Sequence, residues 1–442
     1  MKSKVYLRSI KNLTEKELIN ALNACFEQFG GIKNLIKGKV FIKINATAIN
    51  TDAITTPELI LAFIKLIINS KVNIKNIYIF DNSAFGMPTR LVFKVQNLAK
   101  RIKRLGAIPL YLDEQESIDF EFNGSVLDGS IPIPKILYEN LILNRSDNTY
   151  INLPKLKTHL QTGITACLKN QHGLLYDTEK LYKHHLIDEK IVEIYEKFKP
   201  DFNIVDAINV LNNGAVSFSK NWKIPMNILL AGRDAIAVDR VGAELLGIPL
   251  KRIRSLKIAS ERNLGCCQLS EIEILPDNDI LNKNKIKLND SFEEINDLDV
   301  PEKFQIITGE KYGGCRAGCR GVLEYFKLIA AGGEILPVIG ICWRVYKLDE
   351  LNKLSGSILI TGTCAIKELK NYFENRKDRD NLNVFYIEGH FVIIEFMKPF
   401  RKVSNISLKQ LSTMLQLNLF KIVSGMIGAK LHGANFKSMF GS

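Results

Sequence analysis

The sequence lacks the segments that would carry a protein into or across a membrane. Its first residues, MKSKVYLRSIKNLTEKE, contain no apolar core of signal-peptide length. No run of about 18 or more uncharged apolar residues occurs, so no membrane-spanning helix is expected. We therefore expect a cytoplasmic protein, in a compartment where thiols stay reduced.

Motifs for nucleotides and for ferredoxin-like clusters are absent as well. The 442 residues contain no P-loop, G-x-x-x-x-G-K-[ST], and no dinucleotide fingerprint, G-x-G-x-x-G. Nucleotide use therefore has no motif to support it, and no nucleic-acid motif is present either. The cysteine run C-x2-C-x2-C-x3-C is also missing. If the chain holds an iron–sulfur cluster, cysteines in another arrangement must bind it.

Acidic residues are missing from the last part of the chain. From Met397 to Ser442 there are seven basic residues and no Asp or Glu, and the formal net charge of the whole chain is +13. A helix over 407–431 would place leucines and an isoleucine on one apolar face. We predict that this tail contacts an anionic membrane surface, peripherally at its inner face. The alternatives are packing of the helix on the chain's own second domain, and a protein or nucleic-acid partner.

What the sequence does contain is a regular alternation of strand and helix patterns. KVFIKIN (39–45) and NIYIFDNS (76–83) are typical of buried strands, and the segment 57–71 between them has helical periodicity after Pro57. The same alternation continues to about residue 275. It predicts an α/β fold with a mainly parallel sheet and flanking helices.

A polar segment rich in Asn and Asp interrupts this alternation at 276–303. Four further strand candidates follow it, FQIITG (304–309), ILPVIGIC (335–342), SILITGTC (357–364) and NVFYIEGH (383–390). They predict a second, smaller parallel α/β domain of about 100 residues. The expected parts are residues 1–275, the connecting segment 276–303, a cysteine-bearing domain at 304–396, and the basic amphipathic tail 397–442.

Four of the eight cysteines follow strands of this second domain. Cys315 and Cys319 come after its first strand, Cys342 ends the second, and Cys364 ends the third. Because the carboxyl ends of parallel strands meet at one edge of a sheet, we expect these four thiols to lie together. They predict an iron–sulfur cluster, of the 4Fe-4S type, with structural zinc as the alternative. A dithiol redox pair and simple core packing are the other interpretations.

A second polar concentration lies in INLPKLKTHLQTGITACLKNQHG, residues 151–173. Amine, imidazole and amide groups in one such segment suit an anionic ligand such as a carboxylate or a phosphate. A single lysine is usually a solvated surface residue, and the density of polar groups is what favours a site here. The predicted binding residues are Lys155, Lys169 and Asn170, with Asp81 and Asp206 from two other strand ends, and the predicted catalytic residues are His159 and Lys157.

The motifs INLPKLKTH, LKNQHG, KHH (183–185), NIVDAI and GRDAIAVDRVGAELLG together resemble the DUF362 family over residues 38–265. The segments FIKIN, TTPELI and IFDNS fit the same order. The name of this family states that its function is unassigned. Many of its members are classed as iron–sulfur proteins because they carry ferredoxin-like segments. Since this chain lacks the ferredoxin run, the resemblance does not imply a cluster here, which depends on the four strand-end cysteines instead.

These features favour an iron–sulfur redox protein or oxidoreductase that acts on an anionic small molecule, together with an electron-transfer partner. Two alternatives remain open at this point. One is a non-catalytic binding or scaffold protein held together by structural zinc. The other is a transferase that acts on phosphorylated substrates.

Overall fold

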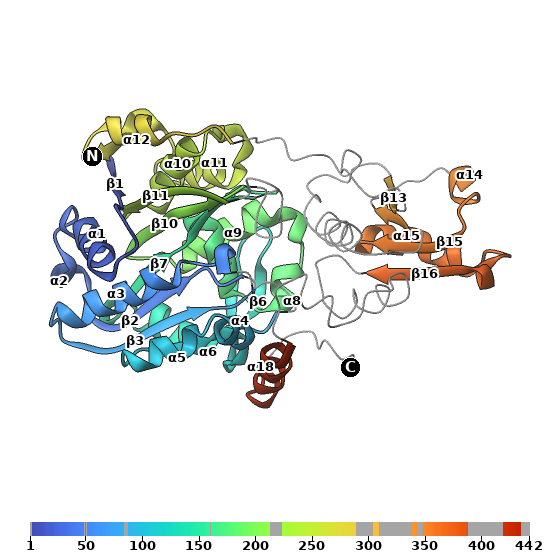
Figure 1. The fold of residues 1–442 in the computed structure, drawn as a ribbon, viewed down its shortest axis with the longest axis horizontal. Helices are drawn as coiled ribbons and strands as arrows, with labels where there is room; N and C mark the ends of the chain where they lie inside the picture. The colour runs from blue at the N-terminus through green and yellow to red at the C-terminus, as the bar shows by residue number, and fades with distance from the viewer. Residues whose placement is uncertain are drawn as a thin grey trace. The chain divides into compact units, whose positions relative to one another are not determined.

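The computed structural model describes residues 2–47, 49, 51–83, 87–159, 161–212, 223–288, 304–308, 338–342, 348–387 and 419–434. The chain forms two compact units (Figure 1). The first unit is Met1–Asp290 with Lys421–Phe436, and the second unit is Ser291–Phe420 with Lys437–Ser442. No helix in the described ranges is long and apolar enough to cross a membrane.

A mixed, mostly parallel sheet forms the centre of the first unit. Its strand order is β12-β1-β11-β10-β7-β2-β3-β4, and β8 and β9 extend it beside β10. Only β11, which pairs with β10 and β1, and the short β9 run antiparallel to their neighbours. The strands are β1 (Ser3–Ser9), β2 (Gly38–Ile44), β3 (Ile74–Asp81), β4 (Ile108–Tyr111), β7 (Thr149–Leu153), β8 (Lys155–His159), β9 (Gly163–Thr165), β10 (Phe202–Leu211), β11 (Lys223–Gly232) and β12 (Ile272–Leu275).

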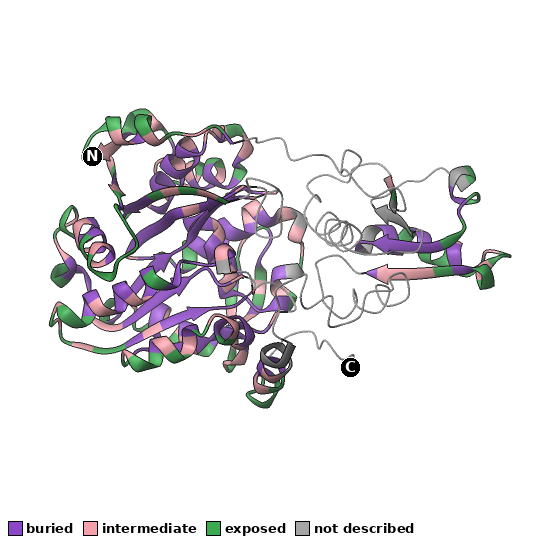
Figure 2. Ribbon diagram, in the orientation of Figure 1, coloured by how far each residue is buried: buried purple, intermediate pink, exposed green. Residues whose placement is uncertain are grey.

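Helices cover this sheet on both faces, and the predicted α/β fold is confirmed (Figure 2). Side chains alternate between the faces of a strand, so Val40, Ile42 and Ile44 of β2 join one core, whereas Phe41 joins another. The helices are α1 (Glu15–Glu27), α2 (Ile32–Leu35), α3 (Pro57–Asn69), α4 (Thr89–Val95), α5 (Leu98–Arg104), α6 (Lys135–Tyr138), α7 (Cys167–Asn170), α8 (Asp177–Leu181), α9 (Ile187–Lys197), α10 (Ala235–Leu245), α11 (Arg254–Glu261) and α12 (Asn278–Asn284). A separate hairpin, β5 (Ser117–Asn123) and β6 (Asp128–Pro134), packs beside α6.

Local sequence signals explain where two of the helices, α3 and α10, begin. Pro57 opens α3, a position where its missing N–H costs nothing. The carboxylate of Asp234 accepts hydrogen bonds from the backbone N–H groups of Ile236 and Ala237 at 2.9 and 3.1 Å, and so caps α10. Both helices then bury apolar residues at helical spacing against the sheet.

The C-terminal helix α18 (Leu419–Leu431) packs with the first unit from Lys421 onward. Its Met426 and Ala429 are buried, and Lys94 of α4 donates a hydrogen bond to the Ser424 hydroxyl at 2.8 Å. A Cβ atom at Gly425 would lie 2.7 Å from Leu91, so the missing side chain allows this close approach. The interpretation that placed this helix on the second domain is therefore wrong, because a helix pattern gives an apolar face but not its partner.

The second unit contains a four-stranded, fully parallel sheet in the order β13-β14-β15-β16. Leu351, Ile358, Ile360, Leu369 and Phe373 form its described core. The strands are β13 (Phe304–Thr308), β14 (Val338–Cys342), β15 (Gly356–Thr361) and β16 (Leu382–Ile387), with helices α14 (Leu348–Leu351) and α15 (Thr363–Glu374).

Candidate functional site

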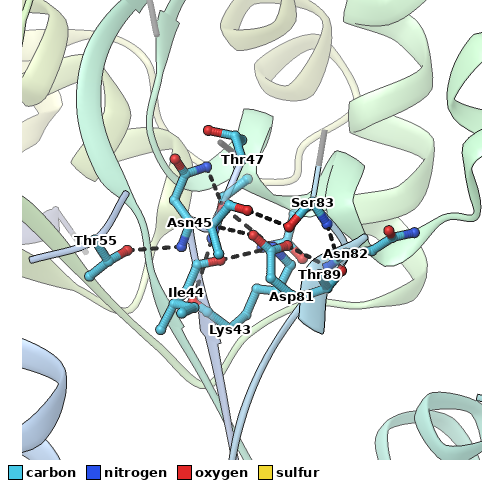
Figure 3. A network of polar contacts seen from close by, with 12 residues as sticks. Lys43, Ile44, Asn45, Thr47, Thr55, Asp81, Asn82, Ser83 and Thr89 are labelled. Atoms are coloured by element: carbon cyan, nitrogen blue, oxygen red, sulfur yellow. Dashed lines mark hydrogen bonds and ion pairs between the residues drawn. The ribbon is translucent and has the colours of Figure 1, made fainter. Parts of the chain in front are cut away.

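Polar side chains of the first unit meet near the carboxyl ends of β2, β3 and β7, and Figure 3 shows those at the ends of β2 and β3. Lys43 is near the end of β2, Asp81 ends β3, and β8 contributes Lys155 and Lys157. The side chains of these four residues are at most 2% exposed. Parallel α/β sheets bind ligands at this edge, and it is where the sequence placed the site.

Lys43 and Asp81 form a buried ion pair in this group. The second carboxylate oxygen of Asp81 accepts the backbone N–H of Ala46 at 2.5 Å, and the Lys43 amine also donates to the Ile44 carbonyl at 3.0 Å. A Cβ atom at position 173 would lie 2.5 Å from the Asp81 carboxylate and 2.8 Å from the Lys43 amine. The glycine of LKNQHG is therefore required by close approach of the backbone to this pair.

Lys155 and Asp206 form a second buried ion pair, with 3.2 Å between the amine and the carboxylate. The same carboxylate accepts the backbone N–H groups of Thr56 at 2.7 Å and Ile208 at 3.0 Å. Asp206 therefore neutralises one lysine and also fixes the start of α3. Removing it would leave a buried ammonium without a counter-ion, which is strongly unfavourable.

Lys157 is buried with neutral hydrogen-bond acceptors instead of a carboxylate. Its amine donates to the Asn45 amide oxygen at 2.8 Å, the Ala53 carbonyl at 3.0 Å and the Thr47 hydroxyl at 3.2 Å. Burial, followed by the positive charges of Lys169 and Lys155, lowers the pKa of Lys157 to about 7. This amine therefore changes charge close to neutral pH.

Lys169 on α7 is half-buried and, among the described residues, has no hydrogen-bond acceptor or ion-pair partner within contact distance. Burial lowers its pKa to about 8, and the charges of Lys180 and Lys43 add to this effect. Lys180 itself is paired with Asp177 at 3.2 Å and donates to the Ser83 carbonyl at 2.7 Å. We call the five amines of Lys43, Lys155, Lys157, Lys169 and Lys180 the lysine cluster.

The lysine cluster holds more positive than negative charge. Asp81, Asp206 and Asp177 each pair with one lysine, which leaves Lys157 and Lys169 without an ion-pair partner among the described residues, although the charges of Asp188 and Asp81 partly oppose the lowering of the Lys169 pKa. Sequence reasoning missed Lys43 and Lys180. Lys43 lies within a strand-like segment that suggested only core packing, and nothing in the sequence linked it to Asp81, 38 residues further on.

Asn170 is placed inside the protein as a bridge between strands. Its side-chain amide donates a hydrogen bond to the Asn152 oxygen at 2.8 Å and accepts one from the Asn45 amide at 3.1 Å. Asn170 therefore orients Asn45, whose amide oxygen accepts the hydrogen bond of Lys157. The preceding turn is fixed by Asp239, whose carboxylate accepts the backbone N–H groups of Cys167 at 2.6 Å and Leu168 at 2.9 Å. Cys167 is buried there.

The two histidines nearest the lysine cluster have different surroundings. The Nδ1 atom of His159 accepts the backbone N–H groups of Gln161 and Thr162, both at 3.2 Å, so it holds the turn after β8. His172 is buried, its ring contacts the edge of His184 at a centroid distance of 5.8 Å, and its Nε2 atom has no hydrogen-bond partner in the described structure. The motifs LKNQHG and KHH contain this pair, but sequence reasoning gave it no role.

Two of the four predicted cluster cysteines are placed by the backbone of the second unit. Cys342 ends β14, and Cys364 is the second residue of α15, directly after the neighbouring strand β15. Cys315 and Cys319 lie outside the described residues. No group of three or more His, Cys, Asp or Glu side chains that could hold a metal occurs where side chains are described. The cluster therefore stays a prediction.

Comparison with known proteins supports the resemblance noted in the sequence. The model of the DUF362 family, described as a domain of unknown function, matches residues 40–244. The thylakoid-associated protein sll1697 of Synechocystis sp. (strain ATCC 27184 / PCC 6803 / Kazusa) is 25% identical over 280 residues, which cover 60% of this chain and 80% of that protein. No solved structure matches the chain significantly. The matched family range contains both ion pairs at Asp81 and Asp206, and Lys157 and Lys169.

Proposed function

We propose that this protein is an iron–sulfur oxidoreductase whose first unit binds an anionic small molecule at the lysine cluster. The observation that supports the anion site is the charge imbalance in a buried place, where five amines meet three carboxylates. Buried charges in proteins are normally paired. An oxyanion beside Lys157 and Lys169 would supply the missing negative charge and accept hydrogen bonds from Lys169.

The lowered pKa values of these two amines support the same proposal. Each amine resists protonation because it is removed from water and lies near other cations. A bound anion stabilises the charged forms, so it raises both pKa values. Near pH 8 the anion should therefore bind together with protons, and its affinity should fall as the pH rises through this range.

Titration calorimetry with inorganic phosphate, sulfate and malonate tests this site. We expect at least one of them to bind at pH 7, and Lys169→Met to weaken that binding tenfold or more, because Lys169 has the least compensated charge. Lys257→Met is the matched control, since the Lys257 side chain is 73% exposed. Equal affinities for the wild type and both variants would rule out the lysine cluster as the site.

The proposed redox activity depends on an iron–sulfur cluster in the second unit. Cys342 is the last residue of β14, and Cys364 follows the adjacent parallel strand β15. Cys364 also lies in the first turn of a helix, where backbone dipoles favour a thiolate. With Cys315 and Cys319 they would hold an iron–sulfur cluster, which supplies one-electron transfer when bound. Structural zinc in a scaffold protein is the alternative, and it requires the same thiolates.

Purification without air, followed by visible spectroscopy and analysis of iron, sulfide and zinc, separates these two metals. An iron–sulfur protein is brown, whereas a zinc protein is colourless. We expect Cys342→Ser and Cys364→Ser to lose most of the iron, and Cys266→Ser to keep it, because Cys266 lies in the first unit. A colourless wild type with stoichiometric zinc would favour the scaffold function. Absence of both iron and zinc would rule out a metal centre at these cysteines.

A second candidate function is phosphoryl or other group transfer on a phosphorylated substrate. The lysine cluster supports this transferase function because ammonium groups bind phosphate well. The calorimetric series distinguishes the two, because a transferase site should prefer phosphate to a dicarboxylate of similar charge by a wide margin.

A further inference from the structure

His172 lies in the short turn η5 (Gln171–Leu174) that follows α7, three residues after Lys169. The residue is only 7% exposed, and its Nε2 atom is buried without a hydrogen-bond partner in the part of the chain that the structure describes. At least about 90% of buried polar groups in proteins are hydrogen-bonded. An unpaired buried ring nitrogen is unfavourable, so its presence beside the lysine cluster needs a reason.

The surroundings of His172 keep its ring neutral in the absence of a ligand. Burial, followed by the charges of Lys169, His184, Lys190 and Lys180, lowers its pKa well below the usual value. The ring lies against His184, and the Lys190 amine is occupied by the carbonyl groups of Glu179 at 2.8 Å and Lys180 at 3.2 Å. The charges that act most strongly on His172 are therefore those of lysines and of a second imidazole.

His159, the residue chosen from the sequence, is less suited to exchange protons. Its Nδ1 atom accepts two backbone N–H groups, which fixes the proton on Nε2 and ties the ring to the β8–β9 turn. Protonation of Nδ1 would break both hydrogen bonds. His172 has no such hydrogen bonds at Nε2 to lose.

We propose that Nε2 of His172 is the proton-transfer atom of the anion site in the first unit, and that the ligand is an oxyanion that gains a proton at oxygen. This inference rests on the proposed anion site. The charge of the bound oxyanion cancels that of the surrounding amines, so the imidazole takes a proton from solvent and becomes an imidazolium. Its Nε2–H group then donates to an oxygen of the ligand and transfers the proton, which returns the ring to its neutral form. No other bond changes in this step.

Histidine nitrogen resonances test this assignment directly. The chain has six histidines, and a His172→Gln variant identifies the signals of His172 in nitrogen-15-labelled full-length protein. We expect the pattern of a neutral imidazole at pH 7.5 without ligand, and that of an imidazolium after saturation with the tightest-binding of inorganic phosphate, sulfate and malonate. His432, which is exposed directly after the C-terminal helix, should not change and serves as the internal reference.

Proton uptake measured by calorimetry in buffers of different ionisation enthalpy gives an independent readout. His172→Gln should bind the anion with an affinity within about fivefold of wild type, while the number of protons taken up falls by close to one. His432→Gln should leave both quantities unchanged. Normal, Lys169-dependent binding with no change in His172 protonation would overturn the role of His172 and leave the anion site standing. Failure of all three anions to bind would overturn both.

Discussion

The buried amine of Lys157 should make the stability of the first unit increase with pH. Its pKa falls from the ordinary value of 10.5 to about 7 because of burial and neighbouring lysines. Since each pKa unit corresponds to about 1.4 kcal/mol, this environment costs the folded state roughly 5 kcal/mol when the amine is charged. Lys157→Met removes the charge but leaves the acceptors at Asn45, Ala53 and Thr47 without a donor, at a cost that does not depend on pH.

The sign of the pH dependence follows from the lowered pKa. Below pH 7 the amine is protonated in both states and the full cost applies. Between pH 7 and 10.5 the unfolded chain keeps a proton that the folded protein has lost, so the free energy of unfolding rises by up to about 1.4 kcal/mol per pH unit. Above 10.5 the cost is absent. From pH 7 to pH 9 the wild type should therefore gain about 2 kcal/mol relative to Lys157→Met.

Urea unfolding at pH 7, 8 and 9 measures this difference. The chain has two tryptophans, so a Trp343→Phe background leaves Trp222, within the first unit, as the fluorescent probe. Lys257→Met is again the exposed control and should follow the wild type. Saturating anion should reduce the slope, because it stabilises the protonated amine. Parallel pH profiles for the wild type and Lys157→Met would refute the reasoning from burial and charge.

Three further substitutions test other parts of the first unit. Gly173→Ala should lower the free energy of unfolding by about 2 kcal/mol or more, because the new Cβ atom meets the Lys43–Asp81 pair. Gly242→Ala in α10 is the control and should change this free energy little, because its Cβ atom would lie 3.4 Å from its nearest neighbour. Asp206→Asn should lower the free energy of unfolding by about 3–5 kcal/mol in the same urea assay, because it leaves the buried Lys155 ammonium without its counter-ion. A smaller decrease would mean that Lys155 finds another partner. On the C-terminal helix, the double change Ile427→Gln and Leu431→Gln should abolish flotation with anionic vesicles, and a wild type that does not float at low salt would exclude membrane contact.

The membrane test depends on where the structure places α18. Ile427 is 53% exposed and Leu431 is 80% exposed on this helix, and no acidic residue occurs between Met397 and Ser442. We propose that these two side chains and the neighbouring Lys430 contact an anionic lipid surface. Deleting the whole tail is a poorer test, because it also removes buried Met426 and Ala429 from the first unit.

The sequence predicted the strands of both sheets well because their apolar runs are long and the helices between them are strongly periodic. It also predicted a site at the strand ends, because that position follows from parallel order alone, and this site stays a prediction. It did not predict which polar groups pair. Lys43 meets Asp81 across 38 positions and Asp206 meets Thr56 across 150, and such contacts depend on strand order, which local patterns do not contain.

The three lysines of the segment 151–173 show what this missing information means for function. They look equivalent in the sequence, yet Lys155 has a carboxylate, Lys157 has three neutral acceptors, and Lys169 has neither among the described residues. An incoming anion gains least from an ammonium that is already neutralised and most from one that is not. Loss of affinity for the anion should therefore be greatest for Lys169→Met, intermediate for Lys157→Met, and visible for Lys155→Met mainly through reduced stability, because that change leaves the buried Asp206 carboxylate unpaired.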